Sequence, residues 1–235
     1  MSCYMKMIFR TCSMNRDAAL TPLSVPEDSG IAPPKRTDVV GLDFERKFWG
    51  MGYKMIAGID EAGRGCLAGP VVAAAVVFPH NCHLDEVRDS KQLSTIARER
   101  AEQSIRTHAI AIGIGISPPK EVDELNVLWA SMEAMRRAVE ALSLDPDFIL
   151  IDGNRCFPRC PWPHETIVKG DARSHSIAAA SIIAKTHRDR LMLRLDRESP
   201  AYKWASNKGY PTRNHYQALA EQGPTRHHRR SFRLK

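Results

Sequence analysis

From Met55 onward, short apolar runs alternate with longer stretches of helical periodicity. A short run rich in β-branched residues predicts a buried strand, and apolar residues at three- and four-residue steps predict an amphipathic helix. The runs that predict strands are MIAGID (55–60), GPVVAAAVVF (69–78), AIAIGIGI (109–116), FILID (148–152) and HETIVK (164–169). The stretches that predict helices are 95–108, with Ser94 as N-cap, 122–142, 176–195 and 210–222, the last closed by Gly223-Pro224.

This order of elements predicts an α/β fold with a mixed five-stranded sheet, flanking helices and a helical C-terminal segment. Strands that alternate with helices are typical of a sheet covered by helices. The first two predicted strands have no convincing long helix between them, which favours a mixed sheet over a fully parallel one.

Residues 1–52 lie outside this pattern. They contain the turn-rich segment TPLSVPEDSGIAPPKR, which favours a disordered N-terminal extension, with order beginning near residues 44–49. Residues 53–235 form the second predicted unit, a domain with a C-terminal helical segment and a basic tail. The first residues resemble no secretory signal, whereas an organelle presequence and a start codon placed too far upstream both stay open. Since no apolar run reaches membrane-spanning length, we expect a cytoplasmic protein.

Charge and cysteine content add little to this assignment. The formal net charge is +7, which suits a polyanionic partner but is weak evidence alone. The six cysteines fit neither a disulfide framework nor a zinc pattern, and Cys156 and Cys160 are too far apart for a CxxC turn. We therefore interpret all six as reduced thiols of a cytosolic protein.

Four carboxylates mark the ends of predicted strands. Asp60 and Glu61 end the first strand, Asp152 ends the fourth, and Asp171 follows the fifth. Ligands gather at the carboxyl edge of open α/β sheets, and clustered carboxylates repel one another unless cations neutralise them. Oxygen ligands select Mg²⁺ or Mn²⁺, and two such ions about 4 Å apart can clamp a phosphodiester during hydrolysis. Taken singly, each acid fits a turn residue or a helix cap equally well.

Around these acids the chain resembles the bacterial type 2 ribonuclease H family, ribonuclease HII. The matching blocks span about residues 55–232 in the family's order, and GIDEAGRG followed by AASIIAK is highly specific. The blocks are GIDEAGRG (58–65), AGPVVAAAV (68–76), DSKQL (89–93), IDGN (151–154), KGD (169–171), AAASIIAKTHRDR (178–190) and NKGYPTRNHYQAL (207–219). Two departures are Cys66, where the family usually has proline, and Ala172, where serine is common.

The resemblance implies a ribonuclease H-like fold and an endonuclease that hydrolyses the RNA strand of RNA–DNA hybrids. It also implies incision 5′ of single ribonucleotides in duplex DNA, leaving a 3′-hydroxyl and a 5′-phosphate, as in ribonucleotide excision repair. The implied cofactors are two Mn²⁺ or Mg²⁺ ions. The carboxylates that would bind the metal and carry catalysis are Asp60, Glu61, Asp152 and Asp171, whereas Asp189 fits a helix-surface salt bridge better.

Two features are candidate readers of the ribose. Gly63-Arg64-Gly65 forms a tight loop that lets backbone approach a ligand closely, and the 2′-hydroxyl distinguishes RNA from DNA. Tyr210 matches a family tyrosine that packs on the sugar beside the scissile junction. The plain alternatives are a hairpin turn with a solvated arginine and a tyrosine that plugs the core.

Several cationic and hydroxyl side chains are candidates for phosphate contacts. Lys91, Lys169 and Lys185 are expected near phosphates or paired to the acids. Ser174 and Ser181 fit helix caps and phosphate donors equally. The basic C-terminal TRHHRRSFRLK fits either sequence-independent phosphate contacts or a solubilising tail.

Two rival functions remain. One is a resolvase, transposase or exonuclease that shares the fold and the acidic site but lacks the ribose-reading loop. The other is a catalytically inactive nucleic-acid-binding module, which the presence of the first three carboxylates disfavours. The expected partner is an RNA–DNA hybrid or a ribonucleotide-containing duplex, bound by a monomer, and a sliding-clamp partner stays unspecified.

Overall fold

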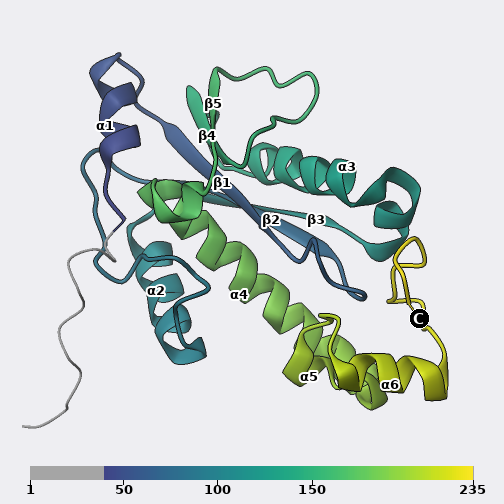
Figure 1. Cartoon of the computed structure of the whole chain (residues 1–235). Coiled ribbons are helices and arrows are strands. Elements are labelled where there is room, and N and C mark those ends of the chain that lie inside the picture. Colours follow the sequence, from purple (N-terminus) through teal and green to yellow (C-terminus); the bar gives the residue numbers. More distant parts are fainter. Residues whose placement is uncertain (1–39, 235) are drawn as a thin grey trace, which may run out of the picture. The chain divides into compact units, whose positions relative to one another are not determined.

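A mixed five-stranded sheet organises residues 40–234, the part of the chain that this computed structural model describes (Figure 1). The strand order is β3-β2-β1-β4-β5, with β1–β2 and β2–β3 antiparallel and β1–β4 and β4–β5 parallel. The predicted mixed five-stranded sheet is therefore confirmed. The strands are β1 (Ile56–Ala62), β2 (Val71–Val77), β3 (Ala111–Ser117), β4 (Phe148–Asp152) and β5 (His164–Ile167).

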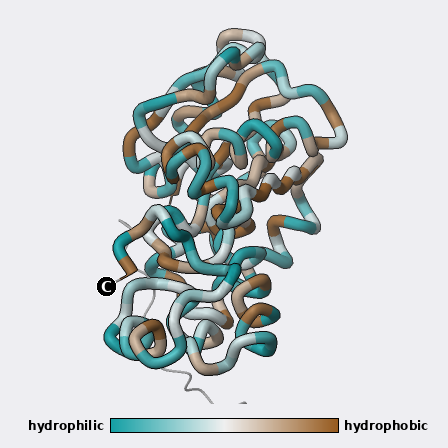
Figure 2. The backbone as a smooth tube through the Cα atoms, turned by 90° about the vertical axis from the view of Figure 1, so that its right-hand side faces the viewer, coloured by the Kyte–Doolittle hydropathy of each residue, from teal (hydrophilic) through white to brown (hydrophobic). Residues whose placement is uncertain are grey.

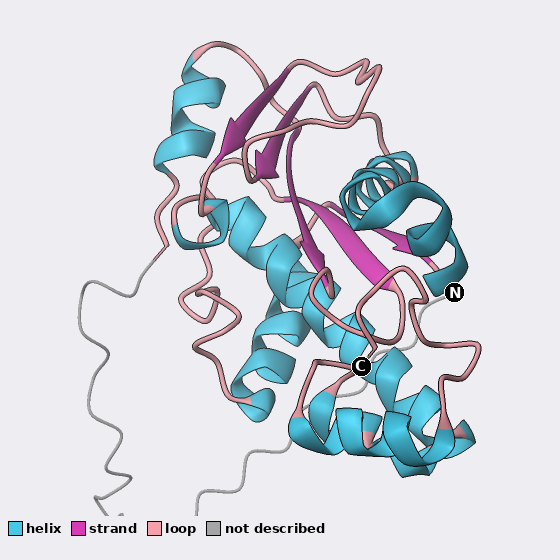
Figure 3. Ribbon diagram, turned by 45° about the vertical axis from the view of Figure 1, so that its right-hand side comes forward, coloured by secondary structure: helices cyan, strands magenta, loops and turns pink. Residues whose placement is uncertain are grey.

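Helices cover both faces of the sheet (Figures 1 and 3). α3 (Pro119–Glu140) packs on the face to which Ala73 and Ala75 of β2 point. α4 (His175–Glu198) and α2 (Thr95–His108) pack on the opposite face, with Ala74 and Val76. The alternation follows from the two-residue period of a strand. The helices carry both hydrophobic and hydrophilic stretches, as expected of elements with one buried face (Figure 2).

Close contact between α4 and β1 depends on Gly58. A Cβ atom at this position would lie 2.2 Å from the backbone carbon of Ser176, so no larger residue fits without moving α4. The first turn of α4 therefore packs directly against the part of β1 that precedes Asp60. The expected Ser94 cap of α2 is confirmed by its hydroxyl, which accepts a hydrogen bond from the Ala97 N–H at 3.2 Å.

The expected continuous helix over residues 122–142 is wrong in one respect. Asn126 has φ 64° and ψ 164°, which interrupts α3 near its start. Its side-chain oxygen accepts hydrogen bonds from the backbone N–H groups of Leu128 and Trp129, at 3.0 and 3.3 Å, and so caps the longer part of the helix. Leu125 and Trp129, which seemed to belong to one buried stripe, are exposed beside this break.

The expected boundary of the N-terminal extension at residue 52 is also wrong. Residues Asp43–Gly50 form the helix α1, whose Phe48 ring stacks on Phe148 of β4 with 3.9 Å between centroids. The buried Glu45 carboxylate accepts hydrogen bonds from the Ser174 hydroxyl and from the Ser176 N–H and hydroxyl, at 2.7–2.9 Å. α1 therefore belongs to the folded unit. The rest of the expectation falls on residues 1–39, outside the described residues.

We predict that Glu45→Ala lowers the free energy of unfolding by about 2–3 kcal/mol, because it leaves buried donors at the start of α4 unpaired. Urea denaturation measures this loss, and Glu86→Ala, at an exposed glutamate, is the matched control. A chain that starts at Met51 should be destabilised similarly, whereas one that starts at Val40 should not. Equal effects of Glu45→Ala and Glu86→Ala would contradict the role given to α1.

The C-terminal segment forms a small cluster at the end of α4. It contains η2 (Pro200–Tyr202), α5 (Trp204–Asn207) and α6 (Arg213–Gln222), with the buried Trp204 and Leu219 in its core. The basic tail was expected either to contact phosphates or to stay solvated. Neither role fits the whole tail, because His228 and Arg229 are buried. The Arg229 N–H also donates to the Leu67 carbonyl at 2.8 Å, which ties this segment to the loop after β1.

Buried histidines make the stability of this fold sensitive to acid. Burial, together with the charges of the neighbouring His215 and His227, lowers the pKa of His228 from 6.5 to about 4. Burial likewise lowers the pKa of His175 to about 4. The unfolded chain therefore binds protons near pH 6.5 that the folded chain takes up only near pH 4. Stability is full above pH 6.5 and falls as the pH drops towards 4.

We predict a loss on the order of 3 kcal/mol per buried histidine between pH 7 and pH 4. Urea denaturation at pH 7 and pH 4.5 measures this difference. His228→Gln, which cannot titrate, should reduce the pH-dependent loss, whereas His108→Gln, at an exposed histidine, should leave it unchanged. An identical pH dependence in wild type and His228→Gln would show that His228 titrates normally.

Within residues 40–234, no helix combines the length and apolar character needed to cross a membrane.

Candidate active site

A cavity of about 460 Å³ lies where β1 and β4 end. Ile59 pairs with Ile151 in the parallel register, so Asp60 and Asp152 occupy the next positions on neighbouring strands. Glu61 follows Asp60 and also lines the cavity. The remaining lining residues come from the end of β1 and the loop after it, from α2 and the segment before it, from α4, and from the segment before α6. They are Ala62, Gly63, Arg64, Gly65, Ser90, Lys91, Arg98, Ser181, Lys185 and Tyr210.

The carboxyl groups of this cavity are held at close quarters. Burial raises the pKa of Asp60 well above its usual value, and the charges of Glu61 and Asp152 raise it further. Burial is also the main cause that raises the pKa of Glu61 and of Asp152. The folded protein thus disfavours the charged form of these three carboxyl groups, and a bound cation would offset that cost.

Asp171 joins this group through η1 (Gly170–Ala172). The Gly170 N–H donates to the Asp152 carboxylate at 2.7 Å, which places η1 against the end of β4. Asp171 is buried, and its carboxylate accepts from the Lys91 ammonium at 2.8 Å. This bond is the main cause that raises the pKa of Lys91. Lys91 therefore pairs with an acid, one of the two positions expected for it.

The Gly63–Gly65 loop is braced from below by two buried arginines. Gly63 has φ 99°, and a Cβ atom there would lie 2.1 Å from Nε of Arg188. Arg188 donates to the carbonyls of Ala68, Pro70 and Lys208 at 2.9–3.1 Å. Arg229 donates to the carbonyls of Arg64 and Gly69 at 2.9 and 3.0 Å. These bonds fix the backbone on both sides of the loop, while Arg64 and Gly65 at its tip stay exposed.

The Arg64 side chain leaves this loop towards the acids. Its guanidinium donates to the Glu61 carboxylate at 3.1 Å while half of the side chain stays exposed. Arg64 is therefore a cation at the rim of the cavity, available to a ligand that displaces water.

Tyr210 lines the cavity as an exposed side chain and does not fill the core. It is 39% exposed and lines the cavity, which rules out the core-plug alternative. The Leu67 N–H donates to the Gly209 carbonyl at 2.8 Å, so the segment before α6 is fixed to the loop after β1. The Lys185 ammonium lies 5.5 Å from the centre of the Tyr210 ring.

The other predicted residues divide into two groups. Lys185 lines the cavity and pairs with Asp189 at 2.7 Å, and Asp189 also pairs with Arg98 at 3.3 Å. Asp189 therefore forms salt bridges as expected, although they are partly buried. Lys169 is exposed at the start of η1 and does not line the cavity.

The two serines have distinct positions. Ser174 is the N-cap of α4, with its hydroxyl accepting from the Ile177 N–H at 3.4 Å. The Ser181 hydroxyl lies 2.9 Å from that of Ser90, lines the cavity and lowers the pKa of Asp60, so it belongs to the acidic cluster. Sequence reasoning missed Ser90, Arg98, Arg188 and Arg229 as parts of the site. Ser90, Arg188 and Arg229 lie in the blocks DSKQL, AAASIIAKTHRDR and TRHHRRSFRLK. Nothing in those blocks indicates which residues are buried.

The cluster offers oxygen ligands, which suits a hard divalent cation. The four carboxylates carry more negative charge than the adjoining Lys91 and Arg64 neutralise. The residues present therefore fit Mg²⁺ or Mn²⁺, and a negatively charged backbone could approach over the basic rim.

Comparison with known proteins agrees with this geometry. The family model of ribonuclease HII matches residues 57–235. Ribonuclease HII of Salinibacter ruber is 55% identical over 196 residues, which cover 82% of this chain and 98% of that protein. The ribonuclease H2 of Pyrococcus horikoshii OT3 is 27% identical with a TM-score of 0.63, covering 77% of this chain and 94% of that one.

A complex of PCNA with ribonuclease HII from Archaeoglobus fulgidus gives the same identity of 27% and TM-score of 0.63, over 77% of this chain and 96% of that one. The region that the family model matches, residues 57–235, contains every residue that lines the cavity and the whole sheet except Ile56. The type 2 ribonuclease H resemblance and the ribonuclease H-like fold are thereby confirmed. This chain belongs to the ribonuclease HII family, endoribonucleases that cleave the RNA strand of RNA–DNA hybrids.

Proposed function

We propose that this chain, besides cutting the RNA strand of hybrids, incises duplex DNA on the 5′ side of a single embedded ribonucleotide. The products would be a 3′-hydroxyl and a 5′-phosphate. The observation that supports this most strongly is that one cavity holds both a carboxylate cluster and a braced glycine loop with an exposed tyrosine beside it. The first can drive hydrolysis, and the second can identify one sugar.

Asp60, Glu61, Asp152 and Asp171 would hold two Mg²⁺ or Mn²⁺ ions. When bound, such ions activate the attacking water and stabilise the charge on the leaving oxygen. The protein orients the ligands. The Glu61 N–H donates to the Asp60 carboxylate and the Gly170 N–H donates to the Asp152 carboxylate, each at 2.7 Å. Lys91 holds Asp171 against the end of β4.

The side chains around the acids would bind the substrate. Arg64 and Lys185 lie at the cavity and can contact phosphates on either side of the cut. The Gly63–Gly65 backbone can approach the ribose closely because Gly65 is exposed with open space where a side chain would stand, and because Arg229 holds the Arg64 carbonyl. Tyr210 can pack on the next sugar, where a deoxyribose presents an apolar face and a ribose presents a hydroxyl.

The decisive experiment is metal-dependent nicking of a labelled DNA duplex that carries one ribonucleotide, with the cut mapped at nucleotide resolution. Cleavage immediately 5′ of the ribonucleotide, absent in an all-DNA duplex and in all-DNA forks, is the expected result. Cleavage of all-DNA forks would instead favour a resolvase-like nuclease. Specific binding without cleavage at any metal concentration would favour the inactive binding module.

A sliding clamp is proposed as a protein partner on the strength of the Archaeoglobus relative, whose structure is a complex with PCNA. Gel filtration of this chain with the clamp of its own cell tests this. Separate elution at micromolar concentrations of both proteins would count against the partnership.

A further inference from the structure

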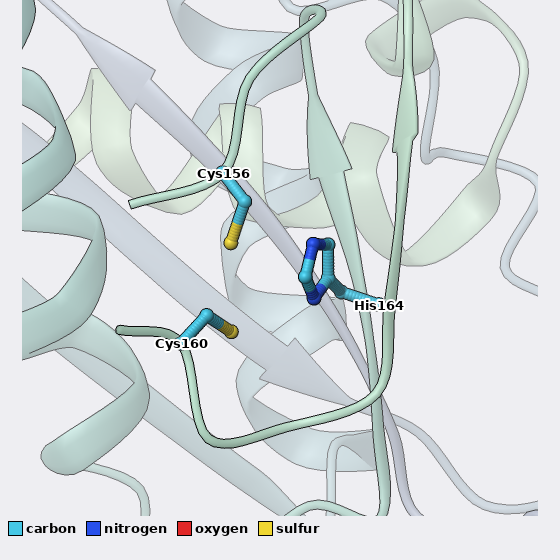
Figure 4. Close-up of side chains that lie close together, drawn as sticks. All are labelled: Cys156, Cys160 and His164. Carbon is cyan, nitrogen blue, oxygen red and sulfur yellow. The ribbon is translucent and has the colours of Figure 1, made fainter. Parts of the chain in front are cut away.

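The loop between β4 and β5 brings together two thiols and an imidazole that the nuclease chemistry does not use. One ligand atom from each of Cys156, Cys160 and His164 lies within 4.8 Å of those of the other two. Figure 4 shows the two sulfur atoms and the imidazole ring facing one another, the cysteines from the loop and the histidine from the strand. We propose that these three residues bind a Zn²⁺ ion.

The local fold explains why residues spaced four apart converge. His164 is the first residue of β5 and is paired with Ile149 in the sheet, so its position is fixed. Arg159 has φ 55°, a left-handed conformation that turns the loop back so that the two cysteines face each other. The sequence alone gives a C-x₃-C-x₃-H spacing, which matches no common zinc motif, and so the cysteines were interpreted as unrelated thiols.

The loop is anchored before any ion binds. Phe157 is buried in the core under α3, and its ring meets that of Trp162 edge-on, with 6.3 Å between centroids. The Trp162 indole N–H donates to the Asp145 carboxylate at 2.7 Å. Ligands on an anchored loop bind a metal at a smaller cost in conformational entropy than ligands on a mobile one.

Hydrogen bonding prepares the imidazole as a metal ligand. Nδ1 of His164 lies 3.0 Å from the Trp162 carbonyl, an acceptor, so Nδ1 carries the proton in the neutral ring. The lone pair of Nε2 is then free to bind a metal, and such a bond to a backbone carbonyl is usual behind zinc-bound histidines. The Cys160 thiol points to the same carbonyl at 3.4 Å, and it would lose this proton on binding the ion.

The chemistry of the donors selects the metal. Two thiolates and one imidazole favour Zn²⁺ over Mg²⁺ or Mn²⁺, which prefer the oxygen ligands of the catalytic cluster. In a tetrahedral zinc site, ligand atoms lie about 3.5–3.8 Å apart, given zinc bonds of about 2.0–2.3 Å. Because the three ligand atoms already lie within 4.8 Å of one another, zinc binding would require them to approach by about 1 Å. Since His164 is exposed, water completes the fourth position.

The consequence concerns the loop that joins Asp152 to the strand preceding Asp171. Gly153, Asn154 and Arg155 start this loop and border a second, smaller cavity that also contains Glu61 and Asp152. A zinc ion bound to Cys156, Cys160 and His164 would link the middle of the loop to β5. It would therefore stiffen the connection between two parts of the catalytic site without touching the substrate.

The test is to add ZnCl₂ to the reduced full-length chain in excess Mg²⁺, remove free ions by gel filtration, and count zinc by mass spectrometry. We expect about one zinc per chain in wild type and in the control Cys82→Ser, whose thiol lies elsewhere. Cys160→Ser and His164→Ala should each retain at least ~10-fold less, since they remove a direct ligand. Zinc should also raise the melting temperature of wild type and not of Cys160→Ser.

Co²⁺ in place of Zn²⁺ identifies the ligands. Wild type should show thiolate-to-cobalt charge-transfer absorption together with the visible bands of a tetrahedral ion, and both should vanish in Cys156→Ser. Circular dichroism shows whether each variant is folded. Retention of zinc at the wild-type level by Cys156→Ser and Cys160→Ser would overturn the proposal. The proposal would also be overturned if wild type forms a Cys156–Cys160 disulfide and still binds no zinc after this disulfide is reduced.

Discussion

Purified Asp60→Asn should cleave neither RNA–DNA hybrids nor a duplex with one embedded ribonucleotide at a measurable rate. We expect a fall of at least ~10³-fold in kcat/KM, or about 4 kcal/mol of transition-state stabilisation. Asp60 is the most buried of the acids at the cavity and the one whose pKa is raised most clearly by its neighbours. An amide keeps the shape of the side chain but removes the charge that would hold the cations.

The same substitution should leave the fold intact and make the metal-free protein slightly more stable. Because the folded-state pKa of Asp60 is raised, its ionised form costs stability at neutral pH, and asparagine removes that cost. Wild type should gain melting temperature when Mn²⁺ is added, and Asp60→Asn should gain much less. Asp85→Asn, at a carboxylate that is 93% exposed, is the matched control and should behave as wild type in every assay.

Near-wild-type nicking by Asp60→Asn would remove Asp60 from the site. A fall in activity together with a large fall in melting temperature would point instead to a structural role. Asp152→Asn, on the neighbouring strand, is expected to repeat the result and separates the two explanations further.

Tyr210→Ala should reduce cleavage at a single embedded ribonucleotide more than cleavage within long hybrids. The exposed ring lies beside the fixed Gly63–Gly65 loop, where the sugar next to the scissile bond would lie. At an isolated ribonucleotide that sugar is deoxyribose and can pack against the ring, whereas in a hybrid it carries a 2′-hydroxyl. Loss of stacking is worth about 1–3 kcal/mol, so the ratio of the two rates should change by about one to two decades.

Tyr210→Phe keeps the ring and should keep the ratio. Tyr216→Ala, at another exposed tyrosine outside the cavity, controls for loss of an aromatic surface residue. The measurement is the pair of cleavage rates for each variant, with melting temperatures alongside. An unchanged ratio in Tyr210→Ala would leave Gly63, Arg64 and Gly65 as the only candidate readers of the junction.

Local patterns predicted the elements of this protein well because their signals lie within a few neighbouring residues. The apolar runs before Asp60 and Asp152 predicted two strands, and the end of each strand gave the position of its acid. The edge rule for α/β sheets led us to expect that these acids converge, whereas the parallel pairing of β1 with β4 that makes two of them neighbours was not predicted. Ser94 could be identified as a cap for the same reason, since its partner is three residues away.

What escaped prediction depends on contacts between distant segments. Arg229 resembles a solvated tail residue until its bonds to Arg64 and Gly69 are known. Glu45 resembles a surface residue of an extension until α4 is placed above it. Asn126 was hidden for another reason: apolar residues keep their three- and four-residue steps on both sides of it, although the helix does not continue through it.

One face of α4 links the chemistry to the recognition of the sugar. Ser181, Lys185 and Arg188 lie at the four- and three-residue steps of that face, the first beside Asp60, the last under Gly63. A helix rises about 1.5 Å per residue, so roughly 10 Å separates the two ends of this stretch. If the proposed function holds, this spacing along α4 would set the distance between the bond that is cut and the sugar that is recognised. A deletion of one residue within this stretch would change both that distance and the direction in which the side chains point.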